Sequence, residues 1–88
     1  MPERDAQPED ALAVEMLGHH GQLVRLAVRI TGDTHLGEDA VGNGYLKAWK
    51  ARAKLQEPSK LLPWLRTICR REAYRLLQQV QQQPGRAG

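Results

Sequence analysis

The side chains best suited to chemistry in this sequence are positive charges that accompany a tryptophan in the second half of the chain. Trp64 is followed by Arg66, Arg70 and Arg71. An indole ring stacks on an unpaired base, and arginine neutralises the adjacent phosphates. This combination favours binding to a single-stranded nucleic acid. The alternative is that Trp64 packs against the preceding helix and that the arginines form an ordinary solvated helix surface.

Charge is unevenly distributed along the 88 residues, although the net charge is only +3. Residues 1–20 have a net charge of −4. Residues 47–75 contain nine lysines and arginines against Glu57 and Glu72, a net charge of +7. A basic second half indicates a polyanionic partner.

The sequence offers little evidence for a catalytic or metal-binding site. His19 and His20 are adjacent, so they point to different faces of a helix, and we expect His35 to lie in a turn. Cys69 falls on an apolar helix face, where a small core residue is the simplest interpretation. We therefore expect no enzymatic activity, no metal and no cofactor.

The cellular location follows from what the sequence lacks. Its single cysteine cannot form an intrachain disulfide, it has no apolar run of membrane-spanning length, and its first residues do not resemble a signal peptide. We expect a cytoplasmic protein that does not contact a membrane.

The elements that must position these residues are all helical. The apolar spacing predicts helices over about 8–17, 23–30 and 34–53, and a fourth that starts between residues 59 and 63 and ends before Pro84. No segment has the alternating pattern of a strand. The sequence therefore predicts an all-α protein, a compact bundle of three to four helices over residues 8–83, with disordered tails at 1–7 and 84–88.

Local signals mark the helix ends. Gly32 is placed to end one helix in a left-handed conformation, and Asp33 or Thr34 is placed to cap the next. Gly42 and Gly44 lie inside the predicted third helix, where each costs about 1 kcal/mol relative to alanine, so we expect a kink or frayed turn there. Pro58 indicates a loop over 55–60. Tyr45 and Trp49 share an apolar face and are expected to pack in the core.

These segments, in their order and spacing, resemble a known family. The landmarks are 23–27, 30–33, Glu38-Asp39-Ala40-Val41, Tyr45-Leu46-Lys47-Ala48-Trp49 and Trp64-Leu65-Arg66-Thr67-Ile68. The set is similar to region 2 of bacterial sigma factors of the extracytoplasmic-function group, over about residues 12–77. The resemblance implies a compact helical domain without catalytic activity that acts in transcription initiation.

The resemblance also implies partners and their contact residues. Core RNA polymerase would dock through the clamp helices of its β′ subunit on Asp39, Val41, Gly42, Asn43 and Leu46. The non-template single strand of the promoter −10 element would contact Lys54, Gln56, Lys60, Trp64, Arg66, Arg70 and Arg71.

Several positions depart from the family pattern and keep a second hypothesis open. Gly42 and Asn43 stand where the family usually has a glutamine and an acid, and Arg71 and Arg75 stand where it has an asparagine and an aspartate. A complete member of the family has a second helical domain that reads the −35 element, and we expect this chain to lack it. The alternative is a sigma-like interaction module that binds an anti-sigma factor as a decoy or regulator, or a remnant without function.

Overall fold

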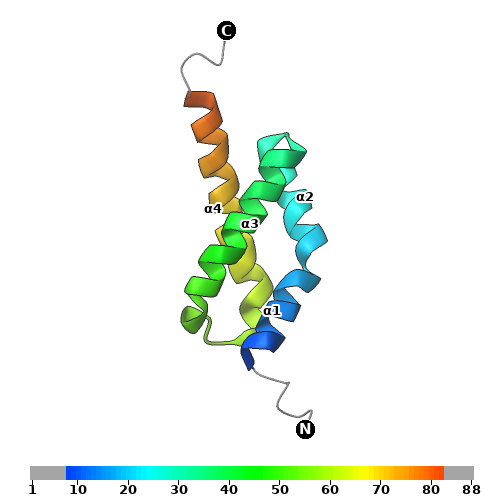
Figure 1. The fold of residues 1–88 in the computed structure, drawn as a ribbon, viewed down its shortest axis with the longest axis vertical. Coiled ribbons are helices and arrows are strands. Elements are labelled where there is room, and N and C mark those ends of the chain that lie inside the picture. Colours follow the sequence, from blue (N-terminus) through cyan, green and yellow to red (C-terminus); the bar gives the residue numbers. More distant parts are fainter. Residues whose placement is uncertain (1–7, 83–88) are drawn as a thin grey trace.

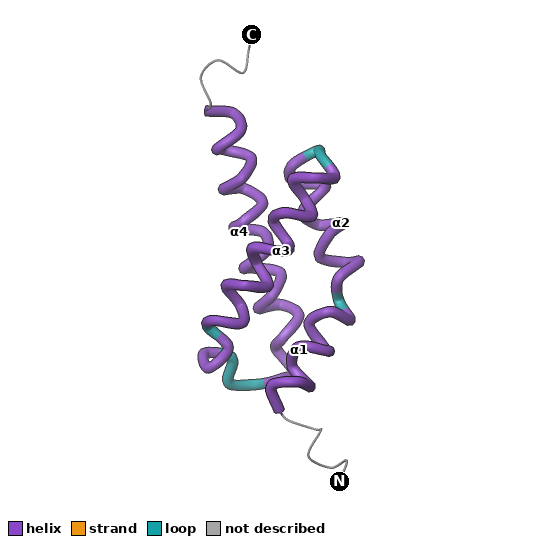
Figure 2. Tube along the Cα trace, in the orientation of Figure 1, coloured by secondary structure: helices purple, strands orange, loops and turns teal. Residues whose placement is uncertain are grey.

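Helices make up nearly all of the part of the chain that the structure describes. A computed structural model describes residues 8–82, and side chains from residue 11 onward. The α-helices are α1 (Pro8–Gly18), α2 (His20–Thr31), α3 (Thr34–Lys50) and α4 (Leu61–Gln82), and two 3-10 turns are η2 (Arg52–Lys54) and η3 (Pro58–Lys60). The described residues contain no strand (Figures 1 and 2). The prediction of an all-α bundle is confirmed. The predicted tails lie outside the described residues.

The turn between α2 and α3 forms as its sequence predicts. Gly32 adopts a positive φ of 73°, and its N–H donates to the carbonyl of Val28 at 2.7 Å. Asp33 is extended, and its carboxylate accepts a hydrogen bond from the backbone N–H of Leu36 at 2.9 Å. A glycine that ends one helix and an aspartate that caps the next reverse the chain within two residues.

Of the other boundaries, the start of α4 falls within the predicted range of 59–63, whereas the end of α3 differs. α3 ends at Lys50 because the chain tightens into the 3-10 turn η2, and the predicted loop includes a second such turn, η3, which begins at Pro58. α4 begins at Leu61, so Pro63 lies in its first turn, where a missing N–H removes no helical hydrogen bond. The expectation that His35 lies in a turn is wrong, because this residue is in the first turn of α3.

The core lies among α2, α3 and α4, and α1 adds one side chain to it. Buried apolar residues come from all four helices: Met16, Leu23, Ala27, Ala40, Val41, Ala48, Leu61, Leu65, Cys69 and Ala73. Several are alanines, which allow the helix backbones to lie close together. Tyr45, Trp49 and Trp64 are half-buried and pack against this core from its edges. Cys69 is fully buried, as the sequence predicted.

α3 lies close against α4 at Gly44. A Cβ atom at this position would lie 2.6 Å from the Sγ atom of Cys69 and 3.4 Å from its Cα atom. Gly44 is therefore the residue that lets the two helices pack. Gly42 is different, because it is exposed and a Cβ atom there would meet nothing within 4 Å. The secondary structure of α3 remains helical through both glycines, so the expected frayed turn is not found.

The two glycines predict opposite effects of alanine on stability. Gly44→Ala should lower the free energy of unfolding by about 1–2 kcal/mol, because the added methyl group overpacks the contact with Cys69. Gly42→Ala should raise it by up to about 1 kcal/mol, because alanine favours an exposed helix interior. Thermal or urea unfolding of both variants beside the wild type measures this. Equal shifts in the two variants would contradict the close packing of α3 on α4.

Candidate nucleic-acid interface

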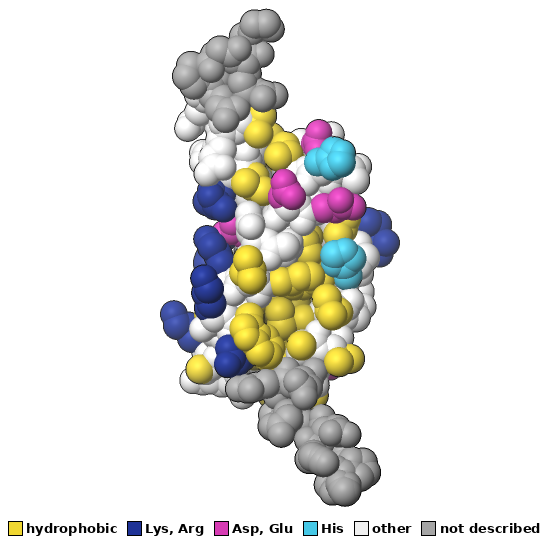
Figure 3. Space-filling model, viewed as in Figure 1, with side chains coloured by type: hydrophobic (Ala, Val, Ile, Leu, Met, Phe, Trp, Pro, Cys, Tyr) yellow, Lys and Arg dark blue, Asp and Glu magenta, His cyan; other side chains and the backbone are white. Residues whose placement is uncertain are grey.

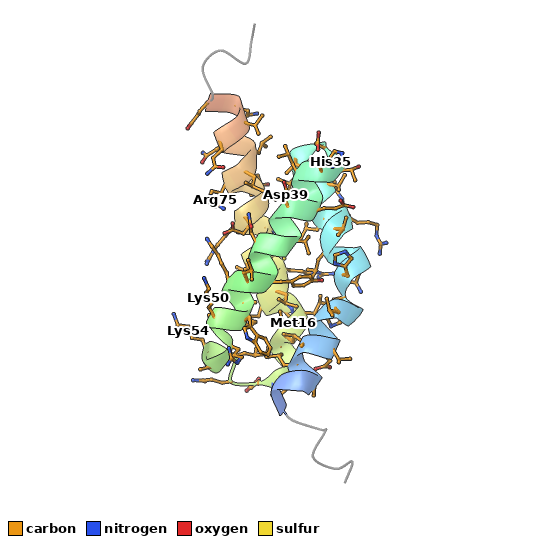
Figure 4. All side chains as sticks on the ribbon, viewed as in Figure 1. Met16, His35, Asp39, Lys50, Lys54 and Arg75 are labelled. Carbon is orange, nitrogen blue, oxygen red and sulfur yellow. The ribbon has the colours of Figure 1, made fainter. Side chains whose placement is uncertain are left out.

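A hollow of about 320 Å³ lies where the loop before α4 meets the start of that helix. Its lining includes four of the predicted DNA-contact residues, Lys54, Gln56, Lys60 and Trp64, together with Leu55 and Glu57. Residues from η2, η3 and α4 thus converge on one concavity. Figure 4 shows Lys54 at the same end of α3 as Lys50, on the left of the view.

Short-range contacts hold the loop that forms this hollow. The side chain of Arg52 donates to the carbonyl of Trp49 at 2.7 Å, and its guanidinium lies 4.3 Å from the centre of the indole ring. Leu55 is half-buried against the core, and the N–H of Lys60 donates to the carbonyl of Glu57 at 2.9 Å. The loop is therefore anchored at both ends, while the tips of its polar side chains stay exposed.

Trp64 lies between the core and the hollow. It is half-buried, packs against the core cluster and also lines the hollow. The side chain is thus partly accessible to solvent. The ion pair between Lys60 and Glu57 is exposed on both sides and has an N–O distance of 3.9 Å, so it leaves the lysine largely available to an anion.

The remaining predicted DNA contacts do not line this hollow. Arg66 and Arg70 line a different groove, between α2 and α4. The helical period explains the separation, because two residues correspond to a rotation of about 200° around a helix. Arg71 is exposed and follows Trp64 by nearly two full turns, so it lies on the Trp64 side of α4. The structure thus divides the predicted DNA surface into two parts.

The predicted polymerase contacts lie on α3, but not all of them face outward. Asp39, labelled in Figure 4, and Gly42 are exposed, Asn43 is half-buried, and Leu46 is 62% exposed. Val41 is fully buried in the core. Its prediction as a direct contact is therefore wrong: the small β-branched side chain packs inside the bundle and presents nothing to a partner.

An apolar groove next to Leu46 is a surface that the sequence analysis missed. It has a volume of about 240 Å³ between α1 and α3, and its lining is Ala13, Met16, Leu17, Tyr45, Leu46 and Trp49. Leu17 is 61% exposed, and Val14 beside it is also exposed. Figure 3 shows hydrophobic side chains gathered over these two helices. Apolar residues are spread around α1, which has no strongly polar face in sequence. The sequence pattern therefore did not indicate which side of α1 would form this groove.

A buried carboxylate joins α3 to α4 beyond the Gly44 contact. Glu72 is 3% exposed, and its two oxygens accept from Lys47 Nζ at 2.6 Å and from Arg75 Nη2 at 2.7 Å. Burial alone raises the pKa of Glu72, but the hydrogen bonds from Arg75 and Lys47 outweigh it and bring the pKa below the ordinary value. Glu72 therefore stays ionised and holds both cations. Nothing in the sequence indicates that a glutamate is buried here.

The buried thiol and the histidines show no catalytic arrangement. Burial, and then the charge of Glu72, raise the pKa of Cys69 to about 11, so the thiol is protonated and is a poor nucleophile. The ring Nδ1 of His20 lies 2.9 Å from the Tyr45 hydroxyl, in an exposed pair. Within residues 11–82, no three His, Cys, Asp or Glu side chains are grouped so that they could hold a metal ion. None of the described helices is long and apolar enough to cross a membrane.

Comparison with known proteins agrees with this architecture. The family model for sigma-70 region 2 matches residues 16–83, and the chain belongs to this family. A protein from Xanthomonas campestris pv. campestris, named as a probable RNA polymerase sigma factor RfaY, is 42% identical over 45 residues. This match covers 51% of the present chain and 11% of the relative. No solved structure matches the chain significantly.

The Glu72 cluster predicts a pH-dependent contribution to stability. Glu72→Gln should lower the free energy of unfolding at pH 7 by about 1–3 kcal/mol, because hydrogen bonds to a charged group are replaced by weaker neutral ones. A carboxylate whose pKa is lowered by folding stabilises the protein above its unfolded pKa, and this stabilisation is lost as the pH falls through the folded value. The difference between wild type and variant should therefore shrink below about pH 4.

Urea unfolding of both proteins from pH 7 to pH 3 measures this difference. Glu57→Gln is the matched control, because Glu57 is exposed and its ion pair is long. A stability difference for Glu72→Gln that stays constant over the whole pH range would contradict the ionised, paired state of Glu72.

Proposed function

We propose that this domain acts in transcription initiation, as the part of a sigma factor that binds core RNA polymerase and captures the single-stranded −10 element of a promoter. The hollow that Trp64 shares with Lys54, Gln56 and Lys60 carries the proposal, together with membership in the sigma-70 region 2 family. Such a protein works where the polymerase is, which places it in the cytoplasm.

The chemistry of the hollow suits one unpaired base with its phosphates. The exposed part of the Trp64 ring offers a stacking surface, and the amide of Gln56 offers a donor and an acceptor for a base edge. Lys54 and Lys60 supply positive charge at the rim. A base within a duplex cannot enter such a concavity, so binding here favours a strand that is already separated.

The stacking role of Trp64 predicts a specific loss of binding. Trp64→Ala should weaken binding to a single-stranded −10 oligonucleotide by about 1–3 kcal/mol, because stacking is lost. Trp64→Phe keeps a stacking ring and should bind close to the wild-type level. Fluorescence anisotropy at low salt measures affinity, and thermal unfolding of the same samples measures packing. If Trp64→Ala unfolds at a much lower temperature and the folded remainder binds DNA normally, the residue belongs to the core alone.

The proposed polymerase surface combines the exposed residues of α3 with the apolar groove. Asp39, Gly42, Asn43 and Leu46 lie along α3, and Leu17 continues the apolar part onto α1. Exposed apolar side chains around a groove, with polar residues beside them, are typical of a surface that binds another protein. The clamp helices of the polymerase β′ subunit are the proposed occupant.

This docking surface predicts that Leu46 contributes to polymerase binding. Leu46→Ser should weaken binding to core polymerase by about 1–2 kcal/mol, because an apolar contact is lost from the interface. Tyr74→Ser is the matched control, since Tyr74 is 54% exposed but lies on α4 outside the groove. Pull-down and titration with purified core polymerase measure the effect. Equal losses in both variants would contradict a docking site at α1 and α3.

A second candidate is a sigma-like module that binds an anti-sigma factor without opening a promoter. One observation favours it: Gly42 is exposed and contributes no side chain to the α3 surface. Polar contacts that the family usually makes there are then missing, while the apolar groove remains for another partner. Tight binding to an anti-sigma protein together with no binding to core polymerase would establish this candidate and exclude the first.

A further inference from the structure

A groove of about 370 Å³ between α2 and α4 is lined by four arginines from two helices. Arg25 and Arg29 come from α2, Arg66 and Arg70 come from α4, and Gln22 and Leu26 complete the lining. All four arginines are exposed. The Arg66 Nη2 atom lies 3.4 Å from Oε1 of Gln22, a neutral partner at long distance. The groove is separate from the hollow that contains Trp64.

The charge in this groove is uncompensated. Arg25 and Arg29 are four residues apart on one helix, and Arg66 and Arg70 are four residues apart on the other. Like charges at this spacing lie on the same face and destabilise a helix. Within residues 11–82, no carboxylate forms an ion pair with any of the four guanidinium groups. The folded protein thus holds four positive charges at the rim of one concavity, an arrangement that an anion would stabilise.

We infer that this groove binds backbone phosphates of the same DNA strand that occupies the Trp64 hollow, with Arg25 and Arg29 as contacts. The inference rests on the proposed function. Guanidinium groups match phosphate oxygens in a bidentate geometry, and two facing pairs suit successive phosphates better than one small anion. α4 supplies side chains to both sites, and a helix is only about 10–12 Å across, so a strand that passes around the start of α4 reaches both.

The two sites have different chemistry and therefore different readouts. The hollow offers a ring for stacking, so its contribution depends on the presence of a base. The groove offers only guanidinium groups and one amide around Leu26, so its contribution should depend on phosphate and on salt. An oligonucleotide with abasic sites at every position retains the phosphates and removes the bases.

The test measures single-strand affinity against salt concentration for Arg25→Gln, Arg29→Gln and a control variant, Lys50→Gln. Each removes one positive charge, and Lys50 is exposed on α3 outside the groove. Each arginine variant should reduce the magnitude of the salt slope by about 0.7, the value for one phosphate contact on a single strand. The same reduction should appear with the abasic oligonucleotide. Lys50→Gln should leave the slope unchanged.

Stability measured at low salt separates lost contacts from lost folding. Arg25→Gln and Arg29→Gln relieve like-charge repulsion, so both should unfold at a temperature equal to or above that of the wild type. A variant that binds DNA more weakly while being at least as stable has lost a contact. A lower unfolding temperature that accounts for the lost binding would overturn the assignment.

The outcomes distinguish this inference from the proposed function. If the wild type and the Trp64 variants behave as proposed but both arginine variants match Lys50→Gln, the groove is not a DNA site and the function stands. If the wild type binds no single-stranded DNA at low salt, both proposals fail. If inorganic pyrophosphate raises the unfolding temperature through these arginines while their loss leaves DNA affinity unchanged, the groove takes a small anion and the DNA assignment is wrong.

Discussion

The contact of Gly44 with Cys69 brings α3 close against α4, and one or the other of these two helices contributes residues to each surface described above. A Cβ atom on Gly44 would lie 2.6 Å from the Sγ atom of Cys69, so any larger residue there would force the thiol or the helices to shift. Less than one helical turn away along each helix, Glu72 accepts hydrogen bonds from Lys47 and Arg75 and crosses the same interface. Steric contact and a buried charge cluster thus fix one helix pair. That pair carries the proposed polymerase surface on α3 and both proposed DNA sites on α4.

α4 contributes residues to two chemically different surfaces, because these residues lie at different angles around the helix axis. Trp64 faces the loop between η2 and η3, whereas Arg66 and Arg70 face α2. Because residues between them, such as Leu65 and Cys69, are buried in the core, α4 cannot rotate without losing apolar contacts from its whole length. The packed core therefore fixes the spacing between Trp64 and the groove that contains Arg66 and Arg70. A strand bound at both would be held in one register relative to the bundle.

Much of the fold could be predicted because its signals are local. Gly32 and Asp33 end one helix and cap the next through backbone geometry and a side chain within three residues, so the sequence alone contains the information. Gly44 and Glu72 differ, because their roles depend on residues that are far along the chain and only meet after folding. A glycine against a thiol 25 positions away has no local signature, and neither does the pairing of Glu72 with Lys47, although Arg75 is only three residues from Glu72. The division of the arginines from Trp64 lies between these cases. The period of the helix predicts that Arg66 and Arg70 point away from Trp64. That they face Arg25 and Arg29 depends on how α2 packs against α4, which the sequence does not show.

Several residues at which the chain departs from the most stable choice lie on the surfaces proposed to bind partners. Gly42 is an exposed glycine within a helix, where alanine would be more stable. Leu17 and Leu46 expose apolar area to water, and the arginine pairs repel one another. The core shows the opposite behaviour: within the described residues no buried side-chain nitrogen or oxygen lacks a hydrogen-bond partner, including Glu72. Local rules that hold inside and fail at selected surface positions indicate that those positions are shaped by something other than folding. A docked protein and a bound nucleic acid would supply the missing contacts, since one covers apolar side chains and the other neutralises arginine.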